Sequence, residues 1–142
     1  MARGIPFVLI AAVAGGLWSV LVSRASREVN PFLGPVIAES TGVVIGLMLL
    51  AGQMRQTALE YSTRGILLLL FAGACVFSVD YFNLRAYGSE LPVSVGAPIF
   101  LGGTIMIASV AGFFLGEGIS ARKLFGIGLV LAGVVLLGSL SE

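Results

Sequence analysis

The chain has 142 residues, of which 58% are apolar and 11% are charged. Soluble domains hold about 45–50% apolar and about 25% charged residues, so this composition excludes an ordinary soluble domain and indicates a membrane protein. The formal net charge is +1, and no run of Lys or Arg offers a surface for nucleic acid or a polybasic lipid anchor. Histidine is absent and Cys75 is the only cysteine, which excludes zinc clusters, haem attachment and intrachain disulfides, and no cofactor is predicted.

Charged residues divide the sequence into five apolar segments. Each is close to the length of about 20 residues that crosses about 30 Å of hydrocarbon. We therefore predict an all-α integral membrane protein whose five transmembrane helices form one domain over residues 1–142. The expected spans are about 5–23, 32–52, 65–84, 92–115 and 123–140. The first is interpreted as a retained span, because no cleavage motif follows it.

The expected effect of two prolines depends on where they lie in the predicted spans. Pro31 follows Asn30 at the start of the second span, where a missing N–H has no intrahelical partner to lose. Pro98 follows several residues of the fourth span, so it removes one helical hydrogen bond and should bend that helix. This kink is either mobile or fixed by neighbouring helices.

Glycines lie mostly inside the apolar segments, where they permit close helix contact. Their spacing fits either packing inside the chain or contact between subunits, and both interpretations stay open. The positions predicted to serve packing or a dimer are Gly42 and Gly46, Gly112 and Gly116, and Gly126 and Gly133.

The basic residues give a weak prediction of orientation. Five lie on the side of the N-terminus and three on the other side: Arg3, Arg55, Arg64, Arg122 and Lys123, against Arg24, Arg27 and Arg85. The positive-inside rule therefore favours a cytoplasmic N-terminus, but so small a margin is compatible with insertion in both orientations.

Glu39 and Asp80 are the acidic residues inside the predicted spans. An acid there costs about 2.5–3.5 kcal/mol on insertion scales, which makes each a candidate functional residue. In this topology the two lie near one level of the membrane. One interpretation is structural, with Glu39 paired to Arg24, Arg27 or Arg85 and with Asp80 hydrated near the headgroups. The other interpretation is that one carboxylate binds either a proton or a cationic substrate, so that the proton and the substrate are exchanged for each other.

Asp80, Asn83 and Tyr87 follow the spacing i, i+3, i+7, which places them on one helical face suited to a polar cavity. Tyr87 alone also fits an interfacial anchor, and Trp18, beside Gly15 and Gly16, fits either a cavity wall or the aromatic belt. Cys75 is interpreted as a packing residue. Without histidine or a Ser-x-x-Lys pair the chain lacks the base of a hydrolase, so an enzyme is not predicted.

The order of these features resembles an EamA-type domain of the drug/metabolite transporter superfamily, over nearly the whole chain. The motifs that carry the resemblance are Trp18 after a glycine-rich stretch, Asn30-Pro31, the segment YFNLRAYGSELPVSVGAPIF with Pro98, Gly116-Glu117-Gly118, and the final GIGLVLAGVVLLG. The sequence departs from the family at Glu39, where relatives often have a basic residue. It also corresponds to only one half of the ten-span members.

The resemblance implies a transporter whose substrate lies in a central cavity between repeats, with alternating access by rocking of one half against the other. Mapped onto this sequence, the cavity would be lined by Trp18, Asp80, Asn83, Tyr87 and Pro98, with Glu39 as a further member. Two copies would supply the inverted architecture as an antiparallel homodimer, and a heterodimer with a second half is the competing assembly. Glu117 would have a structural role before the last span.

The sequence therefore predicts a secondary transporter of a small metabolite or drug-like solute in a prokaryotic inner membrane. One version of this hypothesis couples transport to protons. The competing hypothesis is a non-transporting membrane subunit, in which the glycine faces bind a partner and the acids form structural ion pairs. An intramembrane enzyme would need Asp80 or Glu39 as a lone acid or base.

Overall fold

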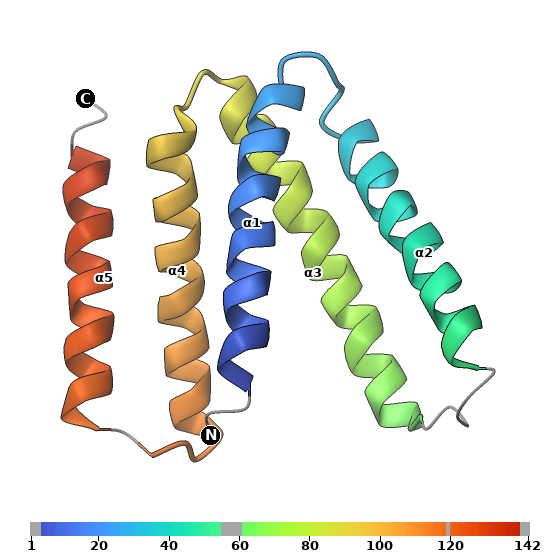
Figure 1. Ribbon diagram of the computed structural model, residues 1–142. Helices are drawn as coiled ribbons and strands as arrows, with labels where there is room; N and C mark the ends of the chain where they lie inside the picture. Colours follow the sequence, from blue (N-terminus) through green and yellow to red (C-terminus); the bar gives the residue numbers. More distant parts are fainter. Residues whose placement is uncertain (1–3, 55–60, 119, 140–142) are drawn as a thin grey trace. The chain divides into compact units, whose positions relative to one another are not determined.

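The computed structural model describes residues 4–54, 61–118 and 120–139. All regular secondary structure in these ranges is helical (Figure 1), in the order α1 (Ile5–Ala25), α2 (Leu33–Gln53), α3 (Thr63–Gly88), α4 (Val93–Phe114) and α5 (Ala121–Ser139). These five helices are 19 to 26 residues long, and their most apolar windows have mean hydropathies of 1.8 to 2.3. Each is long and apolar enough to cross a membrane, so the prediction of an all-α integral membrane protein is confirmed.

The helix ends differ from the predicted spans by up to four residues, and the largest difference is at α3, which continues to Gly88. Arg85 marks the end of the apolar segment, but the backbone hydrogen bonds of the helix continue to Gly88. At the other end, the backbone N–H of Gly65 donates to Ser62 Oγ at 3.0 Å, so Ser62 caps the first turn. The predicted end of the last span, residue 140, lies outside the described residues.

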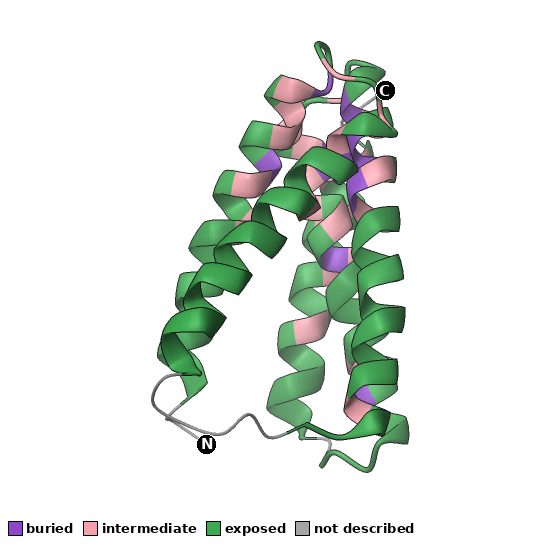
Figure 2. Ribbon diagram, turned by 90° about the vertical axis from the view of Figure 1, so that its right-hand side faces the viewer, coloured by how far each residue is buried: buried purple, intermediate pink, exposed green. Residues whose placement is uncertain are grey.

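Large apolar side chains are exposed on all five helices. Figure 2 shows that exposed positions predominate along the described ribbon. At most 11% of any apolar helix window is buried within the chain. Such exposure would make a soluble protein aggregate. In hydrocarbon it is the expected state, because lipid tails solvate apolar side chains while each helix satisfies its own backbone hydrogen bonds.

The contacts of the chain divide it into two compact units, Met1–Val20 with Leu91–Glu142, and Leu21–Glu90. We name them the α4–α5 unit and the α2–α3 unit and describe each by itself. The single domain predicted over residues 1–142 stays a prediction.

In the α4–α5 unit, helices α4 and α5 lie side by side and antiparallel (Figure 1). They are in close contact where Gly102 of α4 faces Val134 of α5, because a Cβ at Gly102 would overlap Cγ2 of Val134. The rings of Trp18 on α1 and Phe100 on α4 are 5.9 Å apart between centroids.

In the α2–α3 unit, helix α2 packs antiparallel against α3 (Figure 1). Gly34 gives room to the side chain of Leu84, and the rings of Phe32 and Tyr81 lie 4.7 Å apart. Pro35, in the first turn of α2, is buried. These contacts fix the relative level of the two helices.

The end of α4 is a Schellman motif that uses two of the glycines predicted to serve packing. The N–H of Glu117 donates to Gly112 O at 3.0 Å and the N–H of Gly116 donates to Phe113 O at 3.1 Å, while Gly116 has φ +81°. The Glu117 carboxylate lies over Gly112, where an added Cβ would be 3.0 Å from Oε2. Within the described chain, this spacing thus forms the helix end, and the predicted role of the two glycines in packing or a dimer stays a prediction.

Candidate functional site

A buried polar face runs along the last two turns of α3. The buried residues of this helix are Asp80, Asn83, Leu84 and Tyr87, which follow the spacing i, i+3, i+4, i+7 of one helical face. Asp80 is 5% exposed and Tyr87 is 2% exposed. Three of these four buried residues are polar, whereas most of the apolar side chains of α3 are exposed.

The polar groups of this face differ in how they are satisfied. Asn83 Nδ2 donates to the carbonyl oxygen of Val79 at 2.9 Å, within the same helix. The hydroxyl of Tyr87 is buried and has no hydrogen-bond partner in the part of the chain that the structure describes. An unpaired buried hydroxyl costs about 1–3 kcal/mol, so the Tyr87 hydroxyl is an energetically costly group on this face.

Glu39 of α2 shows the same feature. Its Oε1 is shielded from solvent and has no hydrogen-bond partner among the described residues. Arg85, one of the bases expected to pair with it, instead donates from Nη1 to the Tyr81 hydroxyl at 3.2 Å, with its guanidinium 5.9 Å from that ring's centroid. The described ranges contain no ion pair between Glu39 and Arg24, Arg27 or Arg85, so the structural pairing considered above is not formed here.

The register of α2 and α3 places the two acids at a similar level. Gly34 lies against Leu84, and in an antiparallel pair five residues further along α2 correspond to five residues back along α3. That step of about 7.5 Å leads from Gly34 to Glu39 and from Leu84 to Val79, next to Asp80. The burial of Asp80 differs from the hydrated state that the structural interpretation assumed.

Trp18 and Pro98, the remaining predicted cavity residues, belong to the α4–α5 unit and are half-buried. Pro98 lies inside α4 and has no N–H, so the carbonyl of Ser94 receives no helical hydrogen bond from it. Their position relative to the polar face of α3 stays a prediction.

Four of the predicted packing glycines face open space. A Cβ added at Gly42, Gly46, Gly126 or Gly133 would meet no atom within 4 Å. No helix of the described chain packs closely on these positions, so their proposed role in a subunit contact stays a prediction.

Leu84, Ser19 and Ser26 are among the buried residues that sequence reasoning missed. Leu84 follows Asp80 by four residues, so helical spacing was a signal that could have found it. The two serines donate to their own backbone, Ser19 Oγ to Gly15 O at 3.1 Å and Ser26 Oγ to Ser23 O at 2.9 Å. A hydroxyl satisfied in this way leaves no pattern in the sequence that predicts burial.

The residues that the structure describes contain no group of three or more His, Cys, Asp or Glu side chains that could hold a metal ion. What the α2–α3 unit offers is a carboxylate, an amide and a phenol along one face, with a second carboxylate on the neighbouring helix. Such groups bind a polar or cationic solute by hydrogen bonds and charge. Five apolar spans with a buried polar face define an integral membrane protein suited to handling a small solute.

Comparison with known proteins identifies the family. Residues 2–139 match the EamA-like transporter family, and the chain belongs to it. An uncharacterized transporter from Clostridium kluyveri is 26% identical over 133 residues, which are 94% of this chain and 43% of that protein. The chain thus spans less than half the length of this curated relative. No solved structure matches the chain significantly.

Proposed function

We propose that the chain is one five-span half of a secondary transporter that moves a small metabolite or drug-like solute across a prokaryotic inner membrane by alternating access. The observation that carries the proposal is the buried polar face of α3 in a member of a transporter family. Polar and ionisable groups inside spans are expensive and mark substrate or ion pathways by default.

A second half completes the transporter in this proposal. The curated relative is more than twice as long as the matched region, and inverted repeats form one substrate site at their interface. An antiparallel homodimer supplies such a pair with a single sequence, and a heterodimer with a separate half is the alternative. The weak bias of basic residues and the open glycine faces support assembly from two inserted halves.

The proposed coupling uses the acids of the α2–α3 unit. A buried carboxylate oxygen without a partner, as on Glu39, is stabilised by a bound proton or by a cationic group of a solute. If both compete for one carboxylate, release of one drives binding of the other, and no further coupling residue is needed.

Transport by reconstituted protein tests this function. Proteoliposomes loaded with a pH-sensitive dye would be exposed to organic cations, zwitterionic amines and neutral solutes under an imposed pH gradient. We expect some cationic or zwitterionic amines to change the internal pH by exchange with protons, and this change to fall to background with Glu39→Gln. The control is Glu28→Gln, which removes an exposed carboxylate outside the helices. Absence of a solute-driven pH change throughout, or equal changes for both variants, would contradict the proposal.

Labelling of single cysteines tests the assembly separately. Ser89→Cys and Ser120→Cys, each in a Cys75→Ala background, place thiols at exposed positions before and after α4. An antiparallel homodimer predicts that a membrane-impermeant reagent labels about half of each variant from outside intact cells. Labelling of each position from one side only would exclude that dimer and favour a heterodimer or a non-transporting subunit.

A further inference from the structure

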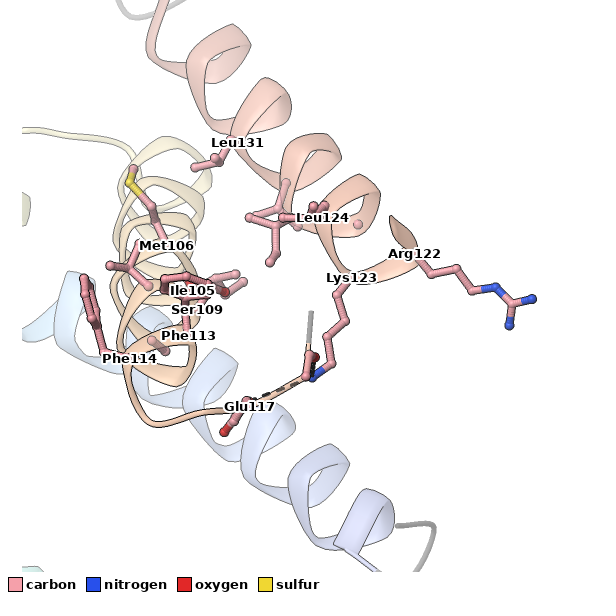
Figure 3. Close-up of a pocket in the computed structure, with 16 residues that line it drawn as sticks. Ile105, Met106, Ser109, Phe113, Phe114, Glu117, Arg122, Lys123, Leu124 and Leu131 are labelled. Carbon is pink, nitrogen blue, oxygen red and sulfur yellow. Dashed lines mark hydrogen bonds and ion pairs between the residues drawn. The ribbon is translucent and has the colours of Figure 1, made fainter. Parts of the chain in front are cut away.

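Helices α4 and α5 enclose a groove of about 1020 Å³ between their C-terminal and N-terminal halves, respectively (Figure 3). Its lining comes from residues 105–118 and 122–131. Most of the lining side chains are apolar, among them Ile105, Met106, Phe113, Leu124 and Leu131. The groove therefore offers an apolar slot within two membrane-spanning helices.

The groove extends along only half of the span. It is closed beyond Ile105 and Leu131, because Gly102 and Val134 bring the two helices into close contact three residues further on. From Lys123 to Leu131 the helix rises about 12 Å, which is close to one leaflet of a hydrocarbon core about 30 Å thick. A helix of a second chain would extend past this closure, whereas a lipid tail ends near it.

Charged groups occur at the open end of the groove, in the segment that joins the two helices. Lys123 Nζ lies 3.9 Å from Glu117 Oε2 and donates to Gly118 O at 3.1 Å. Figure 3 shows Lys123 turned toward Glu117, while Arg122 extends outward from α5. Arg122 has no ion pair within the described ranges. Two bases against one acid leave an excess positive charge beside an apolar slot.

We infer that this groove binds one acyl chain of an anionic phospholipid, with the headgroup phosphate beside Arg122 and Lys123. The apolar part of the ligand matches the slot in length, and its negative charge matches the excess positive charge at the interface. Each Lys or Arg near an anionic lipid surface contributes about 1 kcal/mol, and Glu117 offsets one of the two bases, so the net preference for an anionic headgroup is about fivefold. This inference is independent of the proposed transport site, which lies in the α2–α3 unit.

Native mass spectrometry of the full chain in detergent tests the inference, with phosphatidylglycerol and phosphatidylcholine of identical acyl chains as probes. The headgroup is tested by R122Q/K123Q, with R24Q/R27Q as a control that removes two exposed bases elsewhere. The slot is tested by Gly126→Leu, because Gly126 lines the groove and has open space for a side chain. Gly128→Leu is its control, since Gly128 is equally open but lies outside the lining.

We expect one phosphatidylglycerol to bind about fivefold more tightly than phosphatidylcholine. R122Q/K123Q should abolish this preference and Gly126→Leu should weaken both lipids, while the two controls behave as wild type. Circular dichroism will establish that every variant keeps its helix content. Equal binding of both lipids, or unchanged binding by Gly126→Leu, would overturn the inference. A dimer that Gly126→Leu dissociates, without lipid preference, would instead assign the groove to a second copy.

Discussion

The α2–α3 unit and the α4–α5 unit are both built from apolar helices, but they differ in where their polar groups lie. Where α3 is covered it buries Asp80, Asn83 and Tyr87, and leaves the Tyr87 hydroxyl without a partner among the described residues. Where α4 meets α5, a glycine contact is followed by an apolar groove with charges only at its open end. Exposure of apolar side chains to lipid has little free-energy cost, whereas polar groups inside a span are costly. The buried polar face of α3 therefore marks the candidate site.

Neutralising one acid in each unit should give the largest contrast. We expect Asp80→Asn to lower transport by at least about 30-fold, because removing one partner of a buried charge interaction costs about 2–5 kcal/mol. Glu117→Gln removes half of an exposed ion pair, with side chains 66% and 58% exposed, and should change transport by less than about twofold. Solute-driven changes of internal pH in proteoliposomes measure both. Equal effects would remove the distinction between the units.

The two glycine contacts between helices should differ in their effect on stability. A Cβ at Gly102 meets the β-branched Val134, while a Cβ at Gly34 meets the end of the flexible Leu84 side chain. We expect Gly102→Ala to lower the free energy of unfolding by about 1–3 kcal/mol and Gly34→Ala by less than about 1 kcal/mol. Gly103→Ala is the control because its Cβ meets nothing. Titration with SDS, followed by circular dichroism, measures these values, and the reverse order would contradict the packing described for α4 and α5.

The loop after α4 contains a glycine in a left-handed backbone conformation, and mutation can measure its contribution to stability. Gly116 has φ +81°, a conformation that costs other residues about 1 kcal/mol. We expect Gly116→Ala to lower the free energy of unfolding by about that amount in the same SDS titration. Gly118→Ala, at a glycine without positive φ and with open space, should have almost no effect. If both substitutions act equally, the Schellman motif does not stabilise the end of α4.

At the end of α3 the corresponding left-handed position is occupied by Glu90, with φ 70°. Glu90→Gly should raise the free energy of unfolding by about 0.5 kcal/mol, because relief of the strain exceeds the added freedom of the unfolded chain. Glu90→Ala keeps the strain and should leave stability unchanged. A gain with alanine would assign the effect to the side chain and not to the backbone.

The five spans could be predicted from the sequence because hydropathy and charge alone decide which segments can lie in lipid. The end of α3 could not, because Arg85 interrupts hydropathy while the helix continues to Gly88. Helical spacing also predicted that Asp80, Asn83 and Tyr87 share a face, and the structure buries that face. Their role in binding stays a prediction.

Three features required tertiary structure. Only packing decides that the Tyr87 hydroxyl and Glu39 Oε1 are buried without partners among the described residues. The spacing of Gly112 and Gly116 fits both a helix contact and a helix end. The positive φ of Gly116 shows that it forms the end of α4, and a contact at these glycines stays a prediction. The groove between α4 and α5 left no trace in the sequence, because its lining has the composition of any span.

The most direct test of the polar face is Tyr87→Phe, measured for stability and transport on the same preparation. The substitution removes only a buried hydroxyl that has no partner among the described residues. If that hydroxyl serves a solute, the free energy of unfolding will stay the same or rise, since an unpaired polar group is removed, while transport falls about fivefold or more. Unchanged transport, or a loss of transport that follows a loss of stability, would contradict the assignment of this face to solute binding.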